Sequence, residues 1–289
     1  MRDRLDPLIA ERAPWLFRPT LTARAAWIVL GRMLAYERSV EIGTHYVDQD
    51  VPAIMADLAR RIARRVTFDG LDHVPASGPA LIVANHPTGI ADGIVLHDIL
   101  TRLRPDPFYY ANSDILRVLP QFADIVVPVE WRADRRSVSK TRETMQATRR
   151  ALDARRLGVI FPAGRLAKRR GLRLHERPWM ASAAMIARKN ALPVVPVHIR
   201  ARNSAMFYAF DAFHPTLRDI TLFHETLNKD VQPYHVIFGR PLDGGALPKN
   251  AEEGIEVLRD ATLSLVPDRH GTIDLTRNRP GWRRLPHPT

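Results

Sequence analysis

The sequence predicts an α/β fold, in which a mixed, mostly parallel sheet is flanked by helices and preceded by an N-terminal helical arm. From Val66 onward, short apolar segments alternate with longer segments of helical periodicity, a pattern typical of a sheet covered on both faces. Several apolar segments end in turns that contain Gly, Pro or His. The chain has 289 residues, of which 45% are hydrophobic, so it is long and apolar enough to build such a core.

Local patterns place the expected elements along the chain. Residues 1–20 are polar and contain three prolines, so they are expected to form a loosely held arm. Apolar residues at helical spacing predict helices at about 21–38, 51–65, 89–100, 113–120, 135–156, 177–190 and 251–266. Apolar runs predict strands at 66–70, 80–85, 107–112, 124–129, 158–164 (with its turn), 192–199 and 234–242. The expected units are an N-terminal arm with helices (1–65), an α/β domain (66–270) and a C-terminal tail (271–289).

The charge balance and the absence of cysteine restrict the classes of function. Lysine and arginine number 43 against 31 aspartates and glutamates, a formal net charge of +12. A strongly basic protein is attracted to polyanions such as nucleic acids, anionic lipid surfaces and phosphorylated substrates. An alternative explanation of the positive net charge is that arginine is in excess in all proteins of the source. The chain has no cysteine, which excludes disulfides, thiolate metal sites and a cysteine nucleophile.

The apolar helix expected at 21–36 bears on membrane contact. Arg24 and Arg32 interrupt its apolar run, which is therefore shorter than the roughly 20 residues that a spanning helix requires. Acidic residues near the N-terminus, beginning with Asp3, argue against a signal peptide. The helix is expected either to pack on the domain or to lie in a membrane interface with Trp27 and Tyr36.

The stretch VANHPTGIADG, residues 83–93, combines a histidine and an acid at the end of a predicted strand. Ligands of open α/β sheets gather at the carboxyl ends of strands, and His86 lies at such an end. Asp92 is expected about one and a half turns into the next helix, where it could face the imidazole. An acid bonded to one ring nitrogen supports proton uptake at the other, so the pair is a candidate general base. A solvated polar turn is the alternative interpretation.

A second strand end provides a candidate anion site. The stretch GVIFPAGR, residues 158–165, ends in a turn that projects Arg165. Further basic residues follow at Lys168, Arg169, Arg170, Arg173 and Arg177. Arginine is suited to phosphate and carboxylate groups, so the two strand ends together predict a site for an anionic acceptor with a hydroxyl. The alternative is that 165–177 is only a solvated basic loop.

Three stretches in this order resemble the lysophospholipid (glycerolipid) acyltransferase family: NHPTGIAD (85–92), VIFPAGR (159–165) and LPVVPVHI (192–199). The resemblance covers roughly residues 66–200, with VIFGRPL (236–242) as a further strand that the family often has. It implies an O-acyltransferase similar to 1-acylglycerol-3-phosphate acyltransferases. In such an enzyme a fatty acyl group passes directly from acyl-CoA or acyl-carrier protein to a lysolipid hydroxyl.

The resemblance also implies roles for individual residues. His86 would act as the general base, Asp92 would orient it, and Arg165 would hold the acceptor's phosphate or carboxylate. The substrate-binding residues that it implies are Asn85, Thr88, Phe161, Pro162, Gly164 and Arg165. No metal and no resident cofactor is expected. The expected partners are the lysolipid, the acyl donor and an anionic membrane surface, with no nucleic acid; the expected location is peripheral, on the cytoplasmic face of the cell membrane.

The sequence departs from the family pattern at three places. Five residues, instead of four, separate His86 from Asp92, so one must be absorbed by a bulge or a shifted helix start. Ala163 stands where the family usually has Glu, and Arg165 directly follows Gly164. The family's middle motif is not clear, with Arg132 and Arg135 as candidates for its arginine.

Three other functions are compatible with parts of the sequence. The longer spacing is compatible with a non-catalytic lipid-binding protein of the same fold, and the net charge with a nucleic-acid-binding protein, although no recognised nucleic-acid motif accompanies it. A metallohydrolase would require His86, Asp92, His97 and Asp98 to meet at one ion, and no metal-ligand spacing is present.

Overall fold

The computed structural model describes residues 1–130, 137–213, 221, 225, 232–266 and 272–275. The central feature of the described chain is an eight-stranded mixed sheet, in the order β1-β9-β8-β2-β5-β3-β4, with β10 paired to β8. The strands are β1 (Val66–Asp69), β2 (Ala80–Ala84), β3 (Pro107–Asn112), β4 (Val126–Val129), β5 (Leu157–Ile160), β8 (Pro193–Arg200), β9 (Tyr234–Phe238) and β10 (Leu242–Asp243). All pairs are parallel except β8 with β9 and with β10. The predicted mixed, mostly parallel sheet is confirmed.

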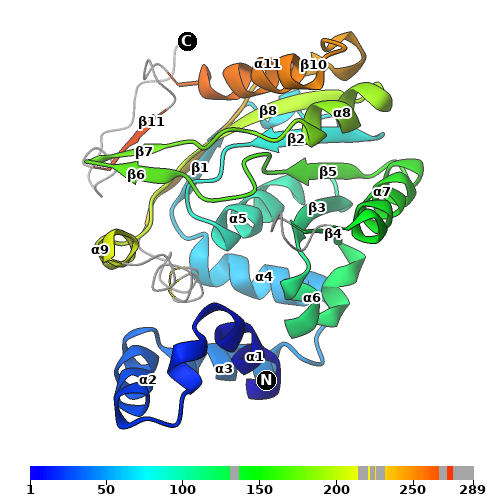
Figure 1. The fold of residues 1–289 in the computed structure, drawn as a ribbon. Coiled ribbons are helices and arrows are strands. Elements are labelled where there is room, and N and C mark those ends of the chain that lie inside the picture. The colour runs from blue at the N-terminus through cyan, green and yellow to red at the C-terminus, as the bar shows by residue number, and fades with distance from the viewer. Residues whose placement is uncertain (131–136, 214–220, 222–224, 226–231, 267–271, 276–289) are drawn as a thin grey trace.

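Helices cover both faces of this sheet (Figure 1). Every residue of β2 is buried, as expected for a strand covered on both sides. Ile82 and Ala84 pack in a core with α4 (Val51–Ile62) and α5 (Ile90–Leu100). Leu81 and Val83 face the opposite core, and the helices that contribute to that core are α7 (Val138–Asp153), α8 (Ser182–Lys189) and α11 (Ala251–Leu263).

The N-terminal residues are packed helices, so the prediction of a loosely held arm over 1–20 is wrong. The elements are α1 (Arg2–Arg12), the 3-10 turn η1 (Pro14–Phe17), α2 (Leu21–Met33) and α3 (Tyr36–His45). Leu5 and Leu8 of α1 are buried in the core on the α4–α5 side of the sheet. The helix predicted over 21–38 is divided at Ala35, which adopts a left-handed backbone with φ 50°.

Two interactions tie α1 to the end of β3. Arg12 pairs with Asp114 at 2.6 Å, and Asn112 donates to the same carboxylate at 3.0 Å. Asp114 begins α6 (Asp114–Val118), which is followed by the 3-10 turn η3 (Pro120–Asp124). The α1–α3 group therefore lies on the side of the sheet that carries α4 and α6 (Figure 1).

A small second sheet lies outside the main one. It has the order β11-β7-β6 and is antiparallel, with β6 (Lys168–Arg170), β7 (Arg173–His175) and β11 (Thr272–Asp274). The alternative that 165–177 is only a solvated loop is thus wrong, because part of it is a paired ribbon. The 3-10 turns η2 (Leu71–His73) and η6 (Gly244–Ala246) and the helix α9 (Ala205–Phe213) complete the described elements. None of the helices in the described chain combines the length and the apolar character needed to cross a membrane.

Candidate active site

The loop that carries His86 is anchored to the sheet by its neighbour Asn85. The Asn85 side chain donates to the carbonyl of Ile199 at 2.9 Å and accepts from the amide of the same residue at 2.6 Å. Asn85 is 2% exposed, so both of its polar groups are satisfied inside the protein. The loop after β2 is thereby fixed to β8, the neighbouring strand.

Gly89 absorbs the extra residue between His86 and Asp92. Its backbone has φ 96° and ψ −134°, a conformation that is essentially restricted to glycine. The helix α5 then begins at Ile90, and Asp92 is its third residue. Asp92 therefore lies in the first turn of α5, and the expectation that it would lie one and a half turns into the helix is wrong.

The His86 imidazole and the Asp92 carboxylate come together despite the longer spacing. His86 Nδ1 lies 2.9 Å from Asp92 Oδ2, and the side chains are 18% and 0% exposed respectively. The approach is oblique, because no partner in the described chain is aligned with Nδ1 as a hydrogen bond. Catalytic hydrogen bonds are often poorly aligned before substrate binds. The contact leaves Nε2 as the ring nitrogen on the side away from Asp92.

The buried Asp92 carboxylate is held by three further donors. Oδ2 accepts from the backbone amides of Thr88 at 2.9 Å and Gly89 at 3.0 Å, and Oδ1 accepts from the Thr88 hydroxyl. The Thr88 oxygen also lies 2.7 Å from Tyr234 Oη. Since Thr88 donates to Asp92, Tyr234 is left to donate to Thr88. Burial of a charge is tolerated only with such partners.

The turn after β5 packs directly on His86. The Phe161 ring stacks on the imidazole with centroids 4.3 Å apart and an interplanar angle of 27°. The Gly164 amide donates to the Phe161 carbonyl at 2.9 Å, and Gly164 has φ 60°. A Cβ at Gly164 would lie 2.8 Å from Met180 Cε, so glycine is favoured there for space as well as conformation.

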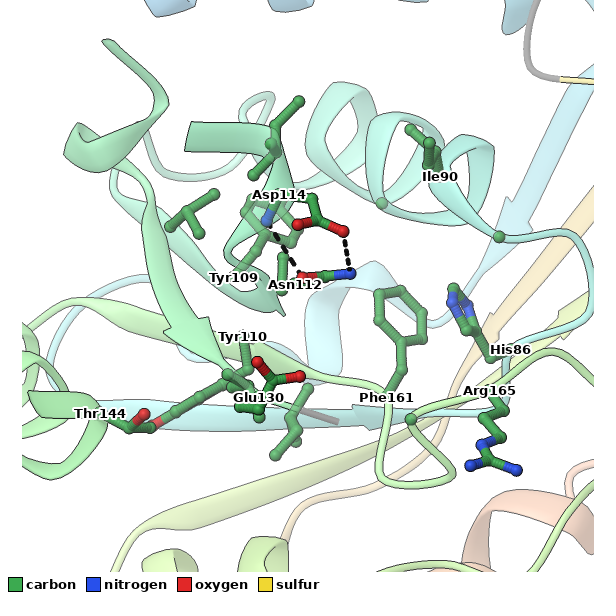
Figure 2. Close-up of a pocket in the computed structure, with 18 of the residues that line it drawn as sticks. His86, Ile90, Tyr109, Tyr110, Asn112, Asp114, Glu130, Thr144, Phe161 and Arg165 are labelled. Atoms are coloured by element: carbon green, nitrogen blue, oxygen red, sulfur yellow. Dashed lines mark hydrogen bonds between the residues drawn. The ribbon is translucent and has the colours of Figure 1, made fainter. Parts of the chain in front are cut away.

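Backbone contacts connect this turn to the histidine loop and to the start of α8. The Ala167 amide donates to the His86 carbonyl at 3.0 Å, and the Met180 amide donates to the Pro162 carbonyl at 3.0 Å. Figure 2 shows Arg165 extending from the same turn, with its guanidinium group directed away from the imidazole. Arg165 is exposed and lines the cleft that contains His86.

Glu176 is a site residue that the sequence reasoning did not identify. Its Oε2 accepts from the backbone amide of His86 at 3.3 Å, and its Oε1 accepts from Trp179 Nε1 at 3.0 Å. Burial raises the pKa of the Glu176 carboxyl to about 7. Glu176 thus brings a carboxyl to the histidine loop in a sequence where Ala163 replaces the glutamate usual in the family.

His86, Phe161, Pro162, Gly164 and Arg165 all line one cleft of about 2680 Å³. One part of it reaches the N-terminal helices and is lined by apolar residues that include Leu5, Leu30, Leu34, Ile94 and Phe122. Another part runs past Phe161 along Tyr110 and Thr144 (Figure 2). Asn85 and Thr88, predicted to bind substrate, are buried and bonded within the protein, which makes them supports of the loop.

The residues considered for a metal site point to different partners. His97 Nδ1 lies 3.3 Å from Tyr109 Oη, and burial lowers the His97 pKa to about 4. Asp98 pairs with Arg102 at 2.7 Å. His97 and Asp98 therefore do not meet His86 and Asp92 at a common metal position. Arg132 and Arg135, the candidates for the family's middle motif, lie outside the described residues.

Comparison with known proteins points to one family. Residues 65–200 match the family model described as Acyltransferase. The chain is similar to two curated proteins named lyso-glycine lipid O-acyltransferase. The protein from Phocaeicola vulgatus is 27% identical over 144 residues, which are 50% of this chain and 50% of that protein. The protein from Bacteroides thetaiotaomicron is 26% identical over 144 residues, 50% of this chain and 51% of that protein.

The match spans about half the length of these curated relatives. A solved structure, the 1-acyl-sn-glycerophosphate acyltransferase PlsC from Thermotoga maritima, is similar with a TM-score of 0.47 and 13% sequence identity, over 92% of this chain and 96% of that one. The family model covers the His86 loop, the turn at Arg165 and the strand β8. Residues 65–200 of this chain are thus similar to the acyltransferase family.

Proposed function

We propose that this protein is an O-acyltransferase that moves a fatty acyl group from a thioester donor to the hydroxyl of a lysolipid. The observation that carries the proposal is the His86–Asp92 pair, with Nδ1 2.9 Å from the carboxylate, on the wall of a large and partly apolar cleft. A base beside an apolar cleft suits a reaction between a hydroxyl and an acyl chain. The similarity of residues 65–200 to the family model described as Acyltransferase supports the same reaction class.

In the proposed reaction His86 Nε2 takes the proton of the acceptor hydroxyl. The hydroxyl oxygen attacks the thioester carbonyl carbon, the carbon–sulfur bond breaks, and the sulfur leaves with the proton that His86 accepted. Asp92 fixes the imidazole orientation and stabilises the imidazolium that forms. No resident metal or cofactor is required, because the thioester already supplies an activated acyl group. Acyl-CoA and acyl-carrier protein are the two proposed donors.

The acceptor is proposed to be a lysolipid with an anionic head group. Arg165 lies on the same cleft as His86, and an arginine can bind a phosphate or a carboxylate with two parallel hydrogen bonds. Two similar proteins are named lyso-glycine lipid O-acyltransferases, and for that reason acceptors with an amino-acid head group belong in the test beside lysophosphatidic acid.

We further propose that the enzyme lies peripherally on an anionic membrane, at the cytoplasmic face. Large apolar side chains of η1 and α2 are exposed: Phe17 43%, Leu21 83%, Ile28 56%, Val29 55% and Met33 44%. Arginines accompany them at positions 18, 24 and 32. This combination of apolar and cationic side chains on a helix suits a lipid interface.

The test is acyl transfer from labelled acyl-CoA and acyl-carrier protein to a panel of lysolipids. His86→Ala should lower kcat/KM by about 10²–10⁴-fold, the range for general base catalysis, and Asp92→Asn by at least about tenfold. His45→Ala is the matched control, because His45 is an exposed histidine outside the lining of the cleft. Transfer that survives His86→Ala would refute the mechanism. Lipid binding without transfer by the wild type would support a non-catalytic protein instead.

A further inference from the structure

The part of the cleft along α7 and α8 has an apolar floor. Four buried residues of β3, β5, α7 and α8 line it: Tyr110, Ile160, Leu152 and Ala184. Figure 2 shows that this part begins beside Phe161, the residue that stacks on His86, and continues past Tyr110 to Thr144 of α7. A narrow, weakly polar chain could therefore lie on this floor with one end at the imidazole.

The rim of the same part is strongly cationic. Six basic residues line it: Lys140, Arg142 and Arg149 from α7, Arg188 and Lys189 from α8, and Lys249 from the segment before α11. The acidic residues that line it are Glu130, Asp153 and Glu252.

Ion pairs occupy only some of these cations, so the others are available to bind a ligand. Lys140 pairs with Glu130 at 2.8 Å, and Arg149 lies 3.7 Å from Asp153. In the described chain, no carboxylate lies within ion-pair distance of Arg142, Arg188 or Lys189. Arginines without an internal partner at the mouth of a cleft are suited to a bound phosphate.

The proposed membrane face lies elsewhere on the molecule. Figure 1 shows α2 at one end and α7 and α8 well apart from it. A lysolipid that enters from the α2 side reaches His86 through the apolar part of the cleft near the N-terminal helices. The part along α7 and α8 is then open to a water-soluble substrate with an anionic end.

We infer that the part of the cleft along α7 and α8 binds the phosphopantetheine arm of the acyl donor. The phosphate end lies among Arg142, Arg188 and Lys189, and the arm runs over the apolar floor and brings the thioester past Phe161 to His86. Phosphopantetheine is common to coenzyme A and to carrier proteins. The inference rests on the proposed function, since it gives that function its donor subsite.

The experiment compares two double variants of equal charge. Arg142→Ala with Arg188→Ala removes two cations from the rim, whereas Arg150→Ala with Arg170→Ala removes two exposed cations that do not line the cleft. The probes are coenzyme A, dephospho-coenzyme A, 3′,5′-ADP, and apo- and holo-carrier protein, measured by direct binding without turnover. The KM values for donor and acceptor are measured in parallel.

The rim variant should weaken coenzyme A or holo-carrier protein binding, and raise donor KM, by at least about tenfold. Acceptor KM should stay within about twofold, and the control variant should resemble the wild type. Competition by 3′,5′-ADP would identify coenzyme A as the source of the arm, and preference for holo- over apo-carrier protein would identify the carrier protein.

Three results would overturn the inference: unchanged donor binding in the rim variant, equal loss in the control, or a rise in acceptor KM alone. The failure of the proposed function looks different. In that case the wild type shows no transfer to any acceptor, whether or not coenzyme A binds. If neither coenzyme A nor holo-carrier protein binds the wild type, the inference is wrong as well.

Discussion

At the scale of single residues, Asp92 shows why a carboxylate can be completely buried beside a histidine. Thr88 and Gly89 supply two amides and a hydroxyl to its oxygens, and His86 lies at 2.9 Å. Because the two amides and the hydroxyl all donate to it, the carboxylate has its hydrogen bonds satisfied and is fixed in position. Tyr234 extends the network, since it donates to the Thr88 hydroxyl from a strand far away in the sequence.

Tyr234→Phe tests this network. The change removes only the Tyr234 hydroxyl, so Thr88 loses a donor and Asp92 is held less firmly. We expect kcat to fall by roughly three- to tenfold, in line with the loss of one buried hydrogen bond, with KM for both substrates nearly unchanged. Thr88→Val should have a larger effect than Thr88→Ser, which keeps the hydroxyl.

Tyr208→Phe is the control for this prediction. It removes a buried hydroxyl that bonds to the Asn203 amide at 3.0 Å, outside the hydrogen bonds of Thr88 and Asp92. Its kcat should equal that of the wild type even if its unfolding midpoint falls. An equal kcat in Tyr234→Phe and the wild type would show that Asp92 does not depend on the tyrosine.

Glu176 gives the protein a pH-dependent stability. Burial raises its pKa from 4.5 to about 7, so the folded protein keeps a proton that the unfolded chain has already released. The contribution of this group to the free energy of unfolding therefore falls as pH rises from 4.5 to 7. The glutamine in Glu176→Gln cannot titrate, so this variant lacks that pH dependence. As pH rises across that range, the unfolding free energy of the wild type should therefore fall relative to that of the variant.

Urea unfolding of both proteins between pH 4.5 and 8 measures this difference. The glutamine amide can accept from only one of the His86 and Trp179 donors, which adds a loss that does not vary with pH. For that reason only the change with pH in the difference between the two unfolding free energies tests the prediction. Parallel curves for the two proteins would mean that folding does not raise the pKa of Glu176.

At the scale of elements, the start of α5 determines whether the His–Asp pair forms. Gly89 has φ 96° and is the N-cap of α5. Gly89→Ala forces a side chain into a conformation that only glycine adopts readily, at about 1–3 kcal/mol. We expect lower stability and a loss of transfer greater than tenfold, because relief of the strain would move Asp92 away from His86.

Gly93→Ala, one turn later in the same helix, is the matched control. A Cβ at Gly93 meets nothing within 4 Å, and alanine is a better helix former than glycine by about 1 kcal/mol. Its unfolding midpoint should therefore be equal to or higher than that of the wild type, with transfer retained. Comparable losses in the two variants would mean that the Gly89 conformation is not the critical feature.

The strands of the site were predictable because their residues are apolar and buried on both faces. The runs 80–85, 107–112 and 192–199 were placed within one residue of β2, β3 and β8, and the motif turns follow the strand ends as expected. The ribbon of β6 and β7 was not predicted, since it consists of short, charged segments such as Lys168–Arg170 that are ordered by pairing. Glu176 and Tyr234 could not be predicted as site residues, because only the tertiary structure brings them to the loop that carries His86.

At the scale of the whole molecule, the exposed apolar face of α2 and the net charge of +12 predict binding to anionic membranes. Ile28→Asp places a charge where an apolar side chain is expected to enter the lipid interface. Its affinity for vesicles that contain anionic lipid should fall by at least about tenfold. Wild-type binding should also weaken as salt is raised from 0.1 to about 0.5 M, because screening weakens the charge attraction.

Val257→Asp is the matched control for membrane binding. Val257 is 42% exposed on α11, which lies on the other side of the molecule from α2 (Figure 1). Co-sedimentation with vesicles of defined composition compares the two variants directly. If both variants bind as the wild type does, α2 is not the membrane face; if both lose affinity equally, the effect is one of charge alone.

The order of the strands has a consequence for synthesis on the ribosome. The edge strand β1 pairs with β9, which begins at Tyr234, and the Tyr234 hydroxyl also completes the hydrogen bonds around Asp92. At about 5–20 residues per second, a nascent chain carries His86 and Asp92 for on the order of ten seconds before these partners are made. During that interval β1 is an unpaired edge open to chaperones, and the hydrogen-bond network around the Asp92 carboxylate is completed only after Tyr234 has been translated.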